Sequence, residues 1–201
     1  GFGNAVSGVS THDLESENRR LRGRVAELER LATTDTLTPL FNRRYFMNEL
    51  DRWCWRAHRY GGSYGLLFLD IDQLKLINDT HGHAAGDAVL RQVALVLREE
   101  TRASDLVARV GGDEFVLVFP GLSDVARLSQ IASRIIERVG DPIDFEGQAC
   151  RISASIGMTT STRYAQVRVD EMHADADEAL YHSKRSGRGR VTVQGEDVAA
   201  R

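Results

Sequence analysis

The chain has 201 residues, of which 42% are hydrophobic and 27% charged, and its formal net charge is −3 at neutral pH. This composition predicts a packed globular domain with an appendage and argues against intrinsic disorder. A slightly acidic chain is not expected to bind nucleic acid through a general basic surface. No apolar run approaches the roughly 18 residues of a membrane span. The two cysteines, Cys54 and Cys150, lack the spacing of a zinc site, so we expect them to be buried thiols in a reducing compartment.

The N-terminal part of the chain predicts a short coiled coil. Residues 1–11 are small and polar, lack an initiator methionine, and are expected to be disordered or a vector remnant. Residues 12–34 carry a heptad repeat whose d positions are Leu14, Leu21 and Leu28 and whose a positions are Asn18, Val25 and Ala32. An Asn at one a position fixes the register of parallel two-stranded coiled coils. Gly23 interrupts the repeat, so an ordinary amphipathic helix that lies on its own domain is the alternative.

The next segments predict a helix and a buried strand. Pro39 ends any helix before it, and Asn42 is a suitable N-cap for a helix that runs to about Tyr60. Residues 63–69 form a nearly continuous apolar run, which predicts a central strand buried on both faces.

Two acids stand where this strand ends, in Asp70-Ile71-Asp72. A carboxylate at the tip of a buried strand is costly unless it is paired or binds a metal. Carboxylate oxygens are ligands that Mg²⁺ accepts, and we therefore expect Asp70 to bind a divalent cation. For Asp72 we expect a helix N-cap at the start of a short helix over residues 73–80.

A second acidic pair lies in Gly111-Gly112-Asp113-Glu114-Phe115, between two short β-branched segments. The two glycines predict a tight hairpin turn with positive φ. Bare backbone followed by two carboxylates allows close approach of a phosphate and binding of a metal ion. A solvated hairpin tip is the alternative. If the turn lies beside the end of the first strand, Asp70 and Asp113 share one metal.

The remaining elements complete an α+β fold. In chain order they are a helix at about 88–98, a helix capped by Ser123 or Asp124 that runs to about Val139, a bent strand or hairpin over 145–159, a polar loop over 160–170, a helix over 170–186 with Lys184 and Arg188 at its basic end, and a strand over 191–193. This order predicts a βαββαβ core, ferredoxin-like or palm-like, with a central, mainly antiparallel sheet. Helices should flank it, largely on one face. We expect this domain to span residues 35–194, with a loose tail over 195–201.

Several motifs, in this order, resemble those of one family. They are Asp35-x-Leu37-Thr38-x-Leu40-x-Asn42-Arg43, Asp70-x-Asp72-x-x-Lys75-x-x-Asn78-Asp79-x-x-Gly82-His83-x-x-Gly86-Asp87, Arg109-x-Gly111-Gly112-Asp113-Glu114-Phe115, Ser155-Ile156-Gly157, and Ala179-Leu180-Tyr181-x-x-Lys184-x-x-Gly187-Arg188. From about Asp35 to Val193 the chain resembles GGDEF domains, the diguanylate cyclases of bacteria. That family condenses two GTP molecules into cyclic di-GMP and releases pyrophosphate.

The resemblance implies a role for each motif residue. The metal ligands would be Asp70, the Ile71 carbonyl and Asp113, with Mg²⁺ as the cofactor and Mn²⁺ as a substitute. The catalytic residues would be Asp113 as proton acceptor, Glu114 and Lys75. The substrate-binding residues would be Asn78, His83, Asp87, Gly111, Gly112, Lys184 and Arg188. A carboxylate such as Asp87 can accept two N–H donors from guanine, and adenine would leave it unpaired.

A regulatory site and a partner are also implied. By themselves, Arg102 and Asp105 would be a solvated surface pair. In the family, Arg-x-x-Asp at this distance before the signature turn binds cyclic di-GMP as an inhibitor, and we expect Arg134 to join it. The resemblance further implies a cytoplasmic homodimer that pairs through the N-terminal helix, alone or as the output domain of a larger sensor, with no nucleic-acid or membrane contact. The alternatives are a catalytically silent module that senses cyclic di-GMP or GTP, and a purely structural dimerisation domain.

Overall fold

The computed structural model describes residues 10–195 and divides the chain between Thr33 and Thr34. The expected disordered start and tail therefore lie largely outside the described residues. The elements are α1 (Thr11–Thr33), β1 (Phe41–Asn42), α2 (Arg43–Tyr60), β2 (Tyr64–Asp72), α3 (Leu74–His81), α4 (His83–Glu99), β3 (Leu106–Arg109), β4 (Glu114–Pro120), α5 (Val125–Val139), β5 (Ile143–Phe145), β6 (Gln148–Cys150), β7 (Ser153–Thr160), a 3-10 turn (Ser161–Arg163), α6 (Val169–Arg185) and β8 (Val191–Val193).

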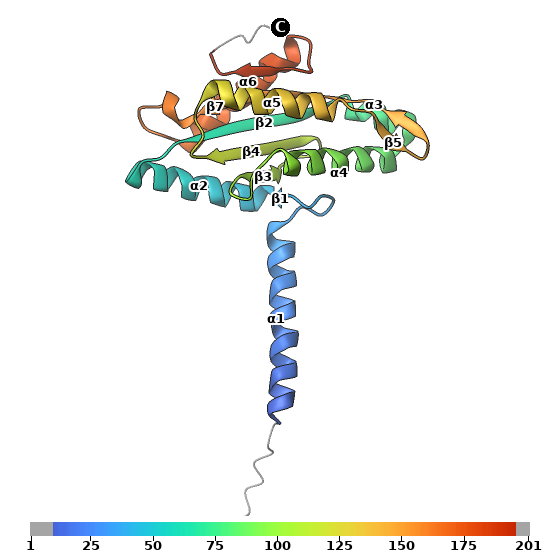
Figure 1. Cartoon of the computed structure of the whole chain (residues 1–201), viewed down its shortest axis with the longest axis vertical. Coiled ribbons are helices and arrows are strands. Elements are labelled where there is room, and N and C mark those ends of the chain that lie inside the picture. The colour runs from blue at the N-terminus through green and yellow to red at the C-terminus, as the bar shows by residue number, and fades with distance from the viewer. Residues whose placement is uncertain (1–9, 196–201) are drawn as a thin grey trace, which may run out of the picture. The chain divides into compact units, whose positions relative to one another are not determined.

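A mixed sheet forms the centre of the second unit. Within residues 34–195 its strand order is β1-β3-β4-β2-β7-β8, with β2 between β4 and β7 (Figure 1). The pairs β2/β4, β2/β7 and β3/β4 are antiparallel, while the edge strands β1 and β8 pair in parallel with β3 and β7. The predicted βαββαβ core with a mainly antiparallel sheet is confirmed. The two parallel edge pairs enlarge it.

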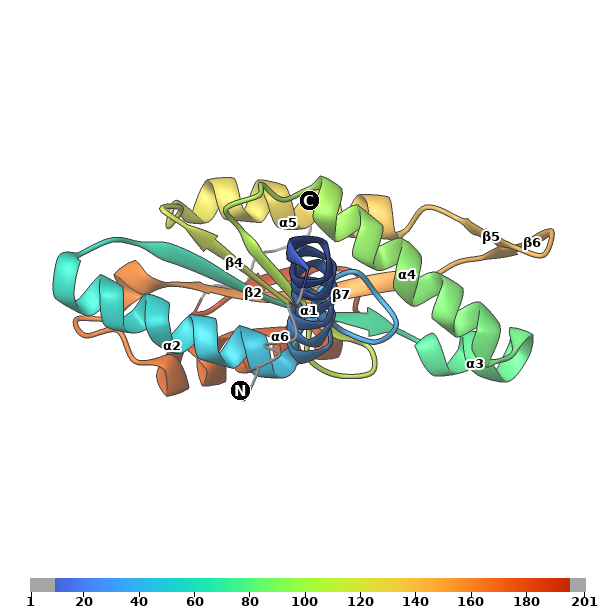
Figure 2. The ribbon, with the colours of Figure 1, turned by 90° about the horizontal axis from the view of Figure 1, so that it is seen from below.

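Helices cover both faces of this sheet, so the expectation that they lie largely on one face is wrong. Figure 2 shows α4 and α5 on one side and α2 and α6 on the other. The reason lies in β2, which is buried along its whole length. Its odd positions, such as Leu67 and Leu69, join the core under α4 and α5, whereas Leu66 and Phe68 join the core under α2 and α6. A strand that is apolar on both faces needs cover on both.

One glycine sets the closeness of α6 to the sheet. A Cβ atom on Gly157 of β7 would lie 2.1 Å from the Leu180 nitrogen and 2.3 Å from the Ala176 carbonyl oxygen. Only a residue without a side chain allows the α6 backbone to approach β7 in this way. The helix that carries Lys184 therefore packs with its backbone directly against β7.

Local signals account for the other boundaries. Asn42 caps α2, and its side chain accepts a hydrogen bond from the Tyr45 amide at 2.9 Å, while Asp124 caps α5 through two amides. The helix expected at 88–98 begins earlier, at His83. Residues 143–150 form the β5/β6 hairpin, whose turn residues Glu146 and Gly147 both have positive φ.

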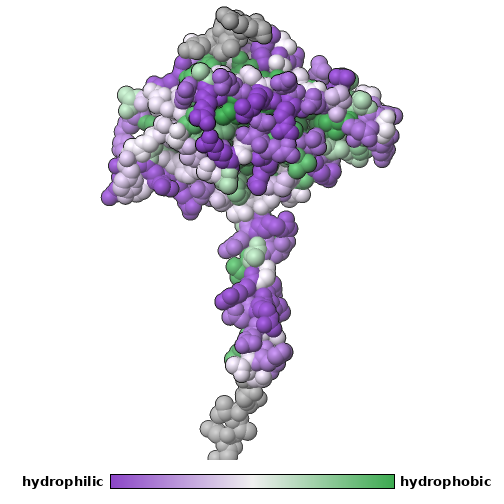
Figure 3. Space-filling model, in the orientation of Figure 1, coloured by the Kyte–Doolittle hydropathy of each residue, from purple (hydrophilic) through white to green (hydrophobic). Residues whose placement is uncertain are grey.

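The first unit is the helix α1, which continues through Gly23. Within residues 10–33 no side chain is buried. The exposed large hydrophobic residues of this helix are Leu14, Leu21, Val25, Leu28 and Leu31. Figure 3 shows hydrophobic patches among the hydrophilic side chains of this helix. The predicted N-terminal helix is confirmed, and it has an unpartnered apolar stripe at heptad spacing.

Candidate active site

The end of β2 lies beside the turn that joins β3 to β4. The register pairs Asp70 with Glu114 on one side and with Ser155 on the other. One step further, the Ile71 amide donates a hydrogen bond to the Asp113 carbonyl oxygen at 3.0 Å. Two acidic segments that are separate in the sequence therefore converge, as the sequence analysis expected.

The Asp70 carboxylate is buried among charges of both signs. Its side chain is 8% exposed, and its Oδ2 atom lies 2.8 Å from Nζ of Lys184, which α6 supplies. Burial raises the pKa of Asp70 to about 6, and the neighbouring carboxylates of Asp113 and Glu114 also favour its protonated form, whereas Lys184 opposes them. A single ammonium therefore does not offset the desolvation and mutual repulsion of the acids at this point.

Asp72 has a structural role that the sequence analysis did not find, and the helix N-cap expected for it is wrong. The residue before α3 is Gln73, which adopts φ 61° and makes no side-chain cap. The Asp72 carboxylate instead accepts hydrogen bonds from Ser153, Ser155 and the Gly189 amide at 2.7–3.1 Å. Arg188 also lies beside it, with Nε 3.9 Å from Oδ1. Asp72 thus ties the loop after α6 to the sheet.

The glycines of the turn leave space rather than adopt unusual torsion angles. Neither Gly111 nor Gly112 has positive φ, so that part of the expectation is wrong. The amides of Val110 and Gly111 both donate to the Glu114 carbonyl oxygen. A Cβ on Gly111 would lie 2.4 Å from Oε2 of Glu114, whereas one on Gly112 would meet nothing within 4 Å. The backbone at Gly112 is therefore open to a ligand.

The Arg109 side chain links this turn to the segment that precedes β1. Its Nε and Nη2 donate to the Gly112 carbonyl oxygen at 3.2 and 2.8 Å, and its Nη1 pairs with Asp35 at 3.2 Å. Asp35 also accepts bonds from the backbone amides of Leu37 and Thr38. Asp35 and Arg109 belong to the sequence motifs, but the sequence alone assigns neither of them a role. Their contact spans 74 positions of the chain, so only the fold reveals it.

The residues expected to bind a base lie on α3 and α4. Asn78 packs so closely on α4 that a Cβ on Gly86 would lie 1.9 Å from its Oδ1, which places Asn78 near Asp87. Lys75 and His83 are exposed, and among residues 10–195 they form no ion pair or side-chain hydrogen bond. The neighbouring His81, rather than His83, contacts another element, through a 2.7 Å bond to Gln148.

The donor set at the end of β2 suits a hard divalent cation that is shared with a ligand. Asp70 and Asp113 offer oxygen atoms, and a cation would relieve the burial cost that raises the pKa of Asp70. Among residues 10–195, however, no three acidic, His or Cys side chains are grouped as a complete metal site. Mg²⁺ typically takes one or two protein carboxylates and completes its shell with water and substrate phosphates. The residues fit that mode of binding.

A polar cavity of about 160 Å³ lies between the C-terminal end of α4, the β3–β4 region and α5. Arg102, Asp105 and Arg134, which the sequence analysis grouped, all line it, together with Glu100 and Arg127. Asp105 accepts a bond from the Arg102 backbone amide at 2.8 Å. The Arg102 guanidinium forms no ion pair within the described part of the chain. The cavity therefore offers guanidinium groups to an anion.

The fold and these motifs define the class of protein. The family model described as "Diguanylate cyclase, GGDEF domain" matches residues 32–190, and the chain belongs to the GGDEF family.

Particular relatives are similar to this chain over most of its length. It is 40% identical over 178 residues to diguanylate cyclase TpbB of Pseudomonas aeruginosa, covering 88% of this chain and 41% of that protein. It is also 40% identical to response regulator PleD of Caulobacter vibrioides over 85% of this chain and 38% of that protein. The chain thus spans about two fifths of these relatives.

A solved structure of similar extent also matches. The coiled coil and GGDEF domain of DgcB from Caulobacter crescentus, in complex with c-di-GMP, has a TM-score of 0.84 and 36% identity, covering 90% of this chain and 96% of that one. None of the helices described here is long and apolar enough to cross a bilayer.

Proposed function

We propose that the protein is a diguanylate cyclase that condenses two GTP molecules into cyclic di-GMP with release of pyrophosphate. The observation that carries this proposal is the convergence of Asp70, Asp113, Glu114 and Lys184 at the end of β2. Family membership and the names of the relatives support it.

Each protomer would hold one GTP, and the 3′-hydroxyl of one nucleotide would attack the α-phosphate of the other. Asp70, the Ile71 carbonyl and Asp113 would hold Mg²⁺, or Mn²⁺ in its place, which would supply charge neutralisation at the phosphates and a lower pKa at the bound hydroxyl. Asp113 accepts the proton of the attacking hydroxyl, and Glu114 assists it. The open backbone at Gly112 allows a phosphate to approach the turn.

The cationic residues would neutralise the charge that develops on the phosphates. Lys184 and Arg188 would bind the β- and γ-phosphates, and Lys75 would stabilise the transition state. Lys184 would then exchange its partner Asp70 for phosphate oxygens. Asn78 and Asp87, with His83 beside them, would hydrogen-bond the guanine edge and reject adenine.

A homodimer is needed because one protomer supplies one nucleotide. The exposed heptad stripe of α1 is the proposed dimer contact, with Asn18 fixing a parallel register. DgcB, the similar solved structure, is named as a coiled coil with a GGDEF domain. We place the protein in the cytoplasm, where GTP is available.

The test is a turnover assay across protein concentrations. The chain, stripped of bound nucleotide, is incubated with GTP and Mg²⁺, and products are separated by chromatography. Cyclic di-GMP and pyrophosphate should form, and the rate per protomer should rise with concentration. Residues 1–201 should sediment as a dimer, whereas a chain limited to residues 34–201 should sediment as a monomer and turn over more slowly at low concentration. The same oligomeric state for both chains would refute the role of α1.

The alternative is a sensor that binds GTP or cyclic di-GMP without turnover. It predicts binding of the nucleotide by calorimetry but no product at any concentration of GTP, metal or protein. The complete Gly-Gly-Asp-Glu-Phe turn favours the cyclase.

A further inference from the structure

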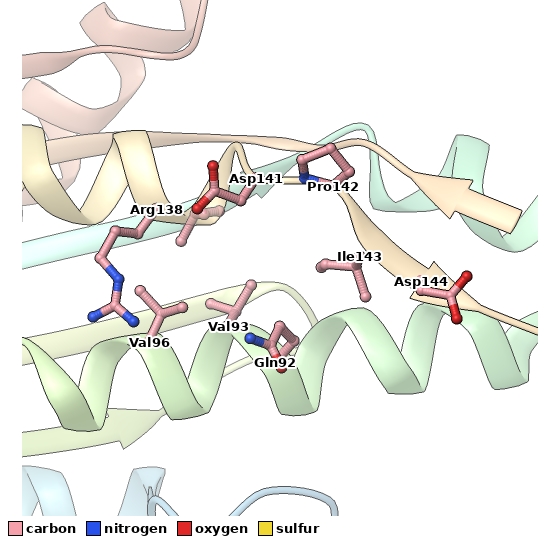
Figure 4. Close-up of a pocket in the computed structure, with 9 residues that line it drawn as sticks. Gln92, Val93, Val96, Arg138, Asp141, Pro142, Ile143 and Asp144 are labelled. Atoms are coloured by element: carbon pink, nitrogen blue, oxygen red, sulfur yellow. The ribbon is translucent and has the colours of Figure 1, made fainter. Parts of the chain in front are cut away.

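A charged cluster joins the C-terminal end of α4 to α5 at the border of the polar cavity that Arg102, Asp105 and Arg134 line. Glu100 accepts a bond from Nε of Arg134 at 3.0 Å and another from Nη1 of Arg138 at 2.9 Å. Its side chain is only 12% exposed. Glu99, the neighbouring acid, is 62% exposed and contacts Arg138 alone within the described residues. Figure 4 shows Arg138 extending from α5 toward α4.

Through these two contacts the Glu100 carboxylate places a negative charge beside Arg134. The phosphate of a bound ligand would place its negative charge beside the same guanidinium. Arg134 and Glu100 both line the cavity at which the family resemblance implies that cyclic di-GMP binds as an inhibitor. One negative charge, largely shielded from solvent, is held against the guanidinium that a ligand phosphate would contact. A phosphate entering the cavity must therefore share Arg134 with Glu100 and tolerate its repulsion.

We propose that Glu100 is an internal competitor that weakens the binding of cyclic di-GMP at this cavity and so sets the product concentration at which inhibition begins. This inference rests on our further proposal that cyclic di-GMP, the product of the proposed reaction, binds at this cavity as an inhibitor. Glu100 keeps Arg134 occupied when no ligand is present. When cyclic di-GMP binds, its phosphate replaces Glu100 as the hydrogen-bond partner of Arg134. Glu100 keeps its bond to Arg138 at the edge of the cavity. The ionised state of Glu100 supports this assignment, because hydrogen bonds from Arg138 and then from Arg134 lower the pKa of its carboxyl.

The test compares two single-charge variants of the full chain, Glu100→Gln and Glu99→Gln, by calorimetric titration with cyclic di-GMP after removal of bound nucleotide. Both variants remove one negative charge at adjacent positions, but only Glu100→Gln releases Arg134. Glu100→Gln should tighten binding about fivefold, equivalent to about 1 kcal/mol. Glu99→Gln should change it less than twofold. In an Arg134→Ala background the effect of Glu100→Gln should disappear, as a double-mutant cycle requires for a pairwise contact.

The possible outcomes separate this inference from the function on which it rests. If neither the unaltered chain nor Arg102→Ala binds cyclic di-GMP, the proposed inhibitor site is wrong. If the unaltered chain binds and Arg102→Ala does not, but Glu100→Gln binds equally or more weakly, the competition is refuted. Equal gains in both Gln variants would also refute it, because they indicate general charge repulsion.

A measurement on the unaltered chain covers the case in which Glu100→Gln does not fold. The NMR signal of the Arg134 Nε–H group should shift when cyclic di-GMP is added, as its bond to Glu100 is replaced. An Arg134 signal that stays unchanged at saturation would overturn the proposal.

Discussion

The acidic cluster at the end of β2 and the charged cluster between α4 and α5 use the same kinds of side chain with opposite results. Around Asp70 the acids outnumber the cations, and burial raises the pKa of that carboxyl to about 6. Around Glu100 two guanidinium groups satisfy one carboxylate and lower its pKa. The first cluster has too little positive charge to offset its acids, and the proposed metal ion would supply the rest. The second is neutralised internally, so the proposed ligand would have to compete with Glu100.

Under the proposed function, this difference explains how one fold would carry a catalytic site and a regulatory site for related nucleotides. The buried strand β2 and the turn before β4 fix the acids rigidly, since their backbones are hydrogen-bonded to each other. The cavity between α4 and α5 is bordered by long side chains at the surface, and Arg134 is 58% exposed. Rigid acids suit catalysis, and exchangeable surface ion pairs suit a reversible inhibitor.

The largest effect should come from Asp113→Asn. The variant keeps the size of the side chain but removes the charge that, in the proposed mechanism, holds the metal and accepts the proton. Cyclic di-GMP formation should fall at least about a hundredfold, the scale of losing one group that stabilises transition-state charge. Chromatography of product at saturating GTP checks this. Asp144→Asn on the exposed part of β5 is the control and should keep full activity. Normal turnover by Asp113→Asn would remove the acidic cluster from the mechanism.

Two glycine substitutions should separate stability from activity. Gly157→Ala forces a methyl group into the α6 backbone and should destabilise the fold by about 3 kcal/mol. For a domain of this size that lowers the melting temperature by roughly 6–12 °C. A methyl group at Gly112 would meet no atom within 4 Å, so Gly112→Ala should leave the melting temperature unchanged. Its turnover should fall, because in the proposed mechanism a phosphate approaches the turn at this point.

Calorimetry and the product assay, run on both variants, give the comparison. A melting temperature that falls equally in the two variants would show that Gly112 has a structural role. Full activity in Gly112→Ala would show that phosphate does not approach the turn.

The opposite pKa shifts should appear as opposite pH dependences of stability in metal-free buffer. Asp70 binds its proton more tightly in the folded than in the unfolded state, so between about pH 4 and pH 6 the folded state holds more protons. Through this group, stability therefore falls as pH rises across that window, by on the order of 2 kcal/mol. Glu100 acts in the other direction, since its stabilisation is present above its unfolded pKa near 4.5 and is lost as pH falls.

Denaturant titrations of Asp70→Asn and Glu100→Gln against the unaltered chain measure both contributions. Asp70→Asn should gain relative stability as pH rises toward 7, whereas Glu100→Gln should lose it as pH rises through 4.5. The Glu100 effect should be the smaller one, because solvent screens its partners. Parallel curves for the two variants would remove the electrostatic distinction between the clusters.

The sequence was sufficient where the signal is local. The apolar run over residues 63–69 identified β2, and Asn42 identified the start of α2. It was insufficient where the partner is remote. In the sequence, Asp72 stands where a helix cap is expected. In the structure it accepts hydrogen bonds from Ser153, Ser155 and Gly189, which lie 81 or more positions away in the chain.

The same reason applies to Arg109 and to the second helix layer. Nothing beside Arg109 in the chain predicts that it joins Asp35 to Gly112. The apolar character of both faces of β2 did predict cover on both sides, and the expectation of a single layer overlooked that consequence. The closeness of α6 to β7 depends on Gly157, whose requirement is visible only against the α6 backbone.

The smallest effect on the protein itself should come from Arg102→Ala, which removes a guanidinium that has no ion-pair partner within residues 10–195. Stability and uninhibited turnover should not change. Inhibition by added cyclic di-GMP should require roughly ten- to a hundredfold more inhibitor, since a charged hydrogen bond contributes about 1.5–3 kcal/mol. Arg98→Ala, an exposed arginine in the last turn of α4, is the matched control and should leave the inhibition curve in place. If both variants shift the curve equally, the cavity attracts the inhibitor through its overall charge, and the contrast between a rigid catalytic cluster and a specific regulatory one fails.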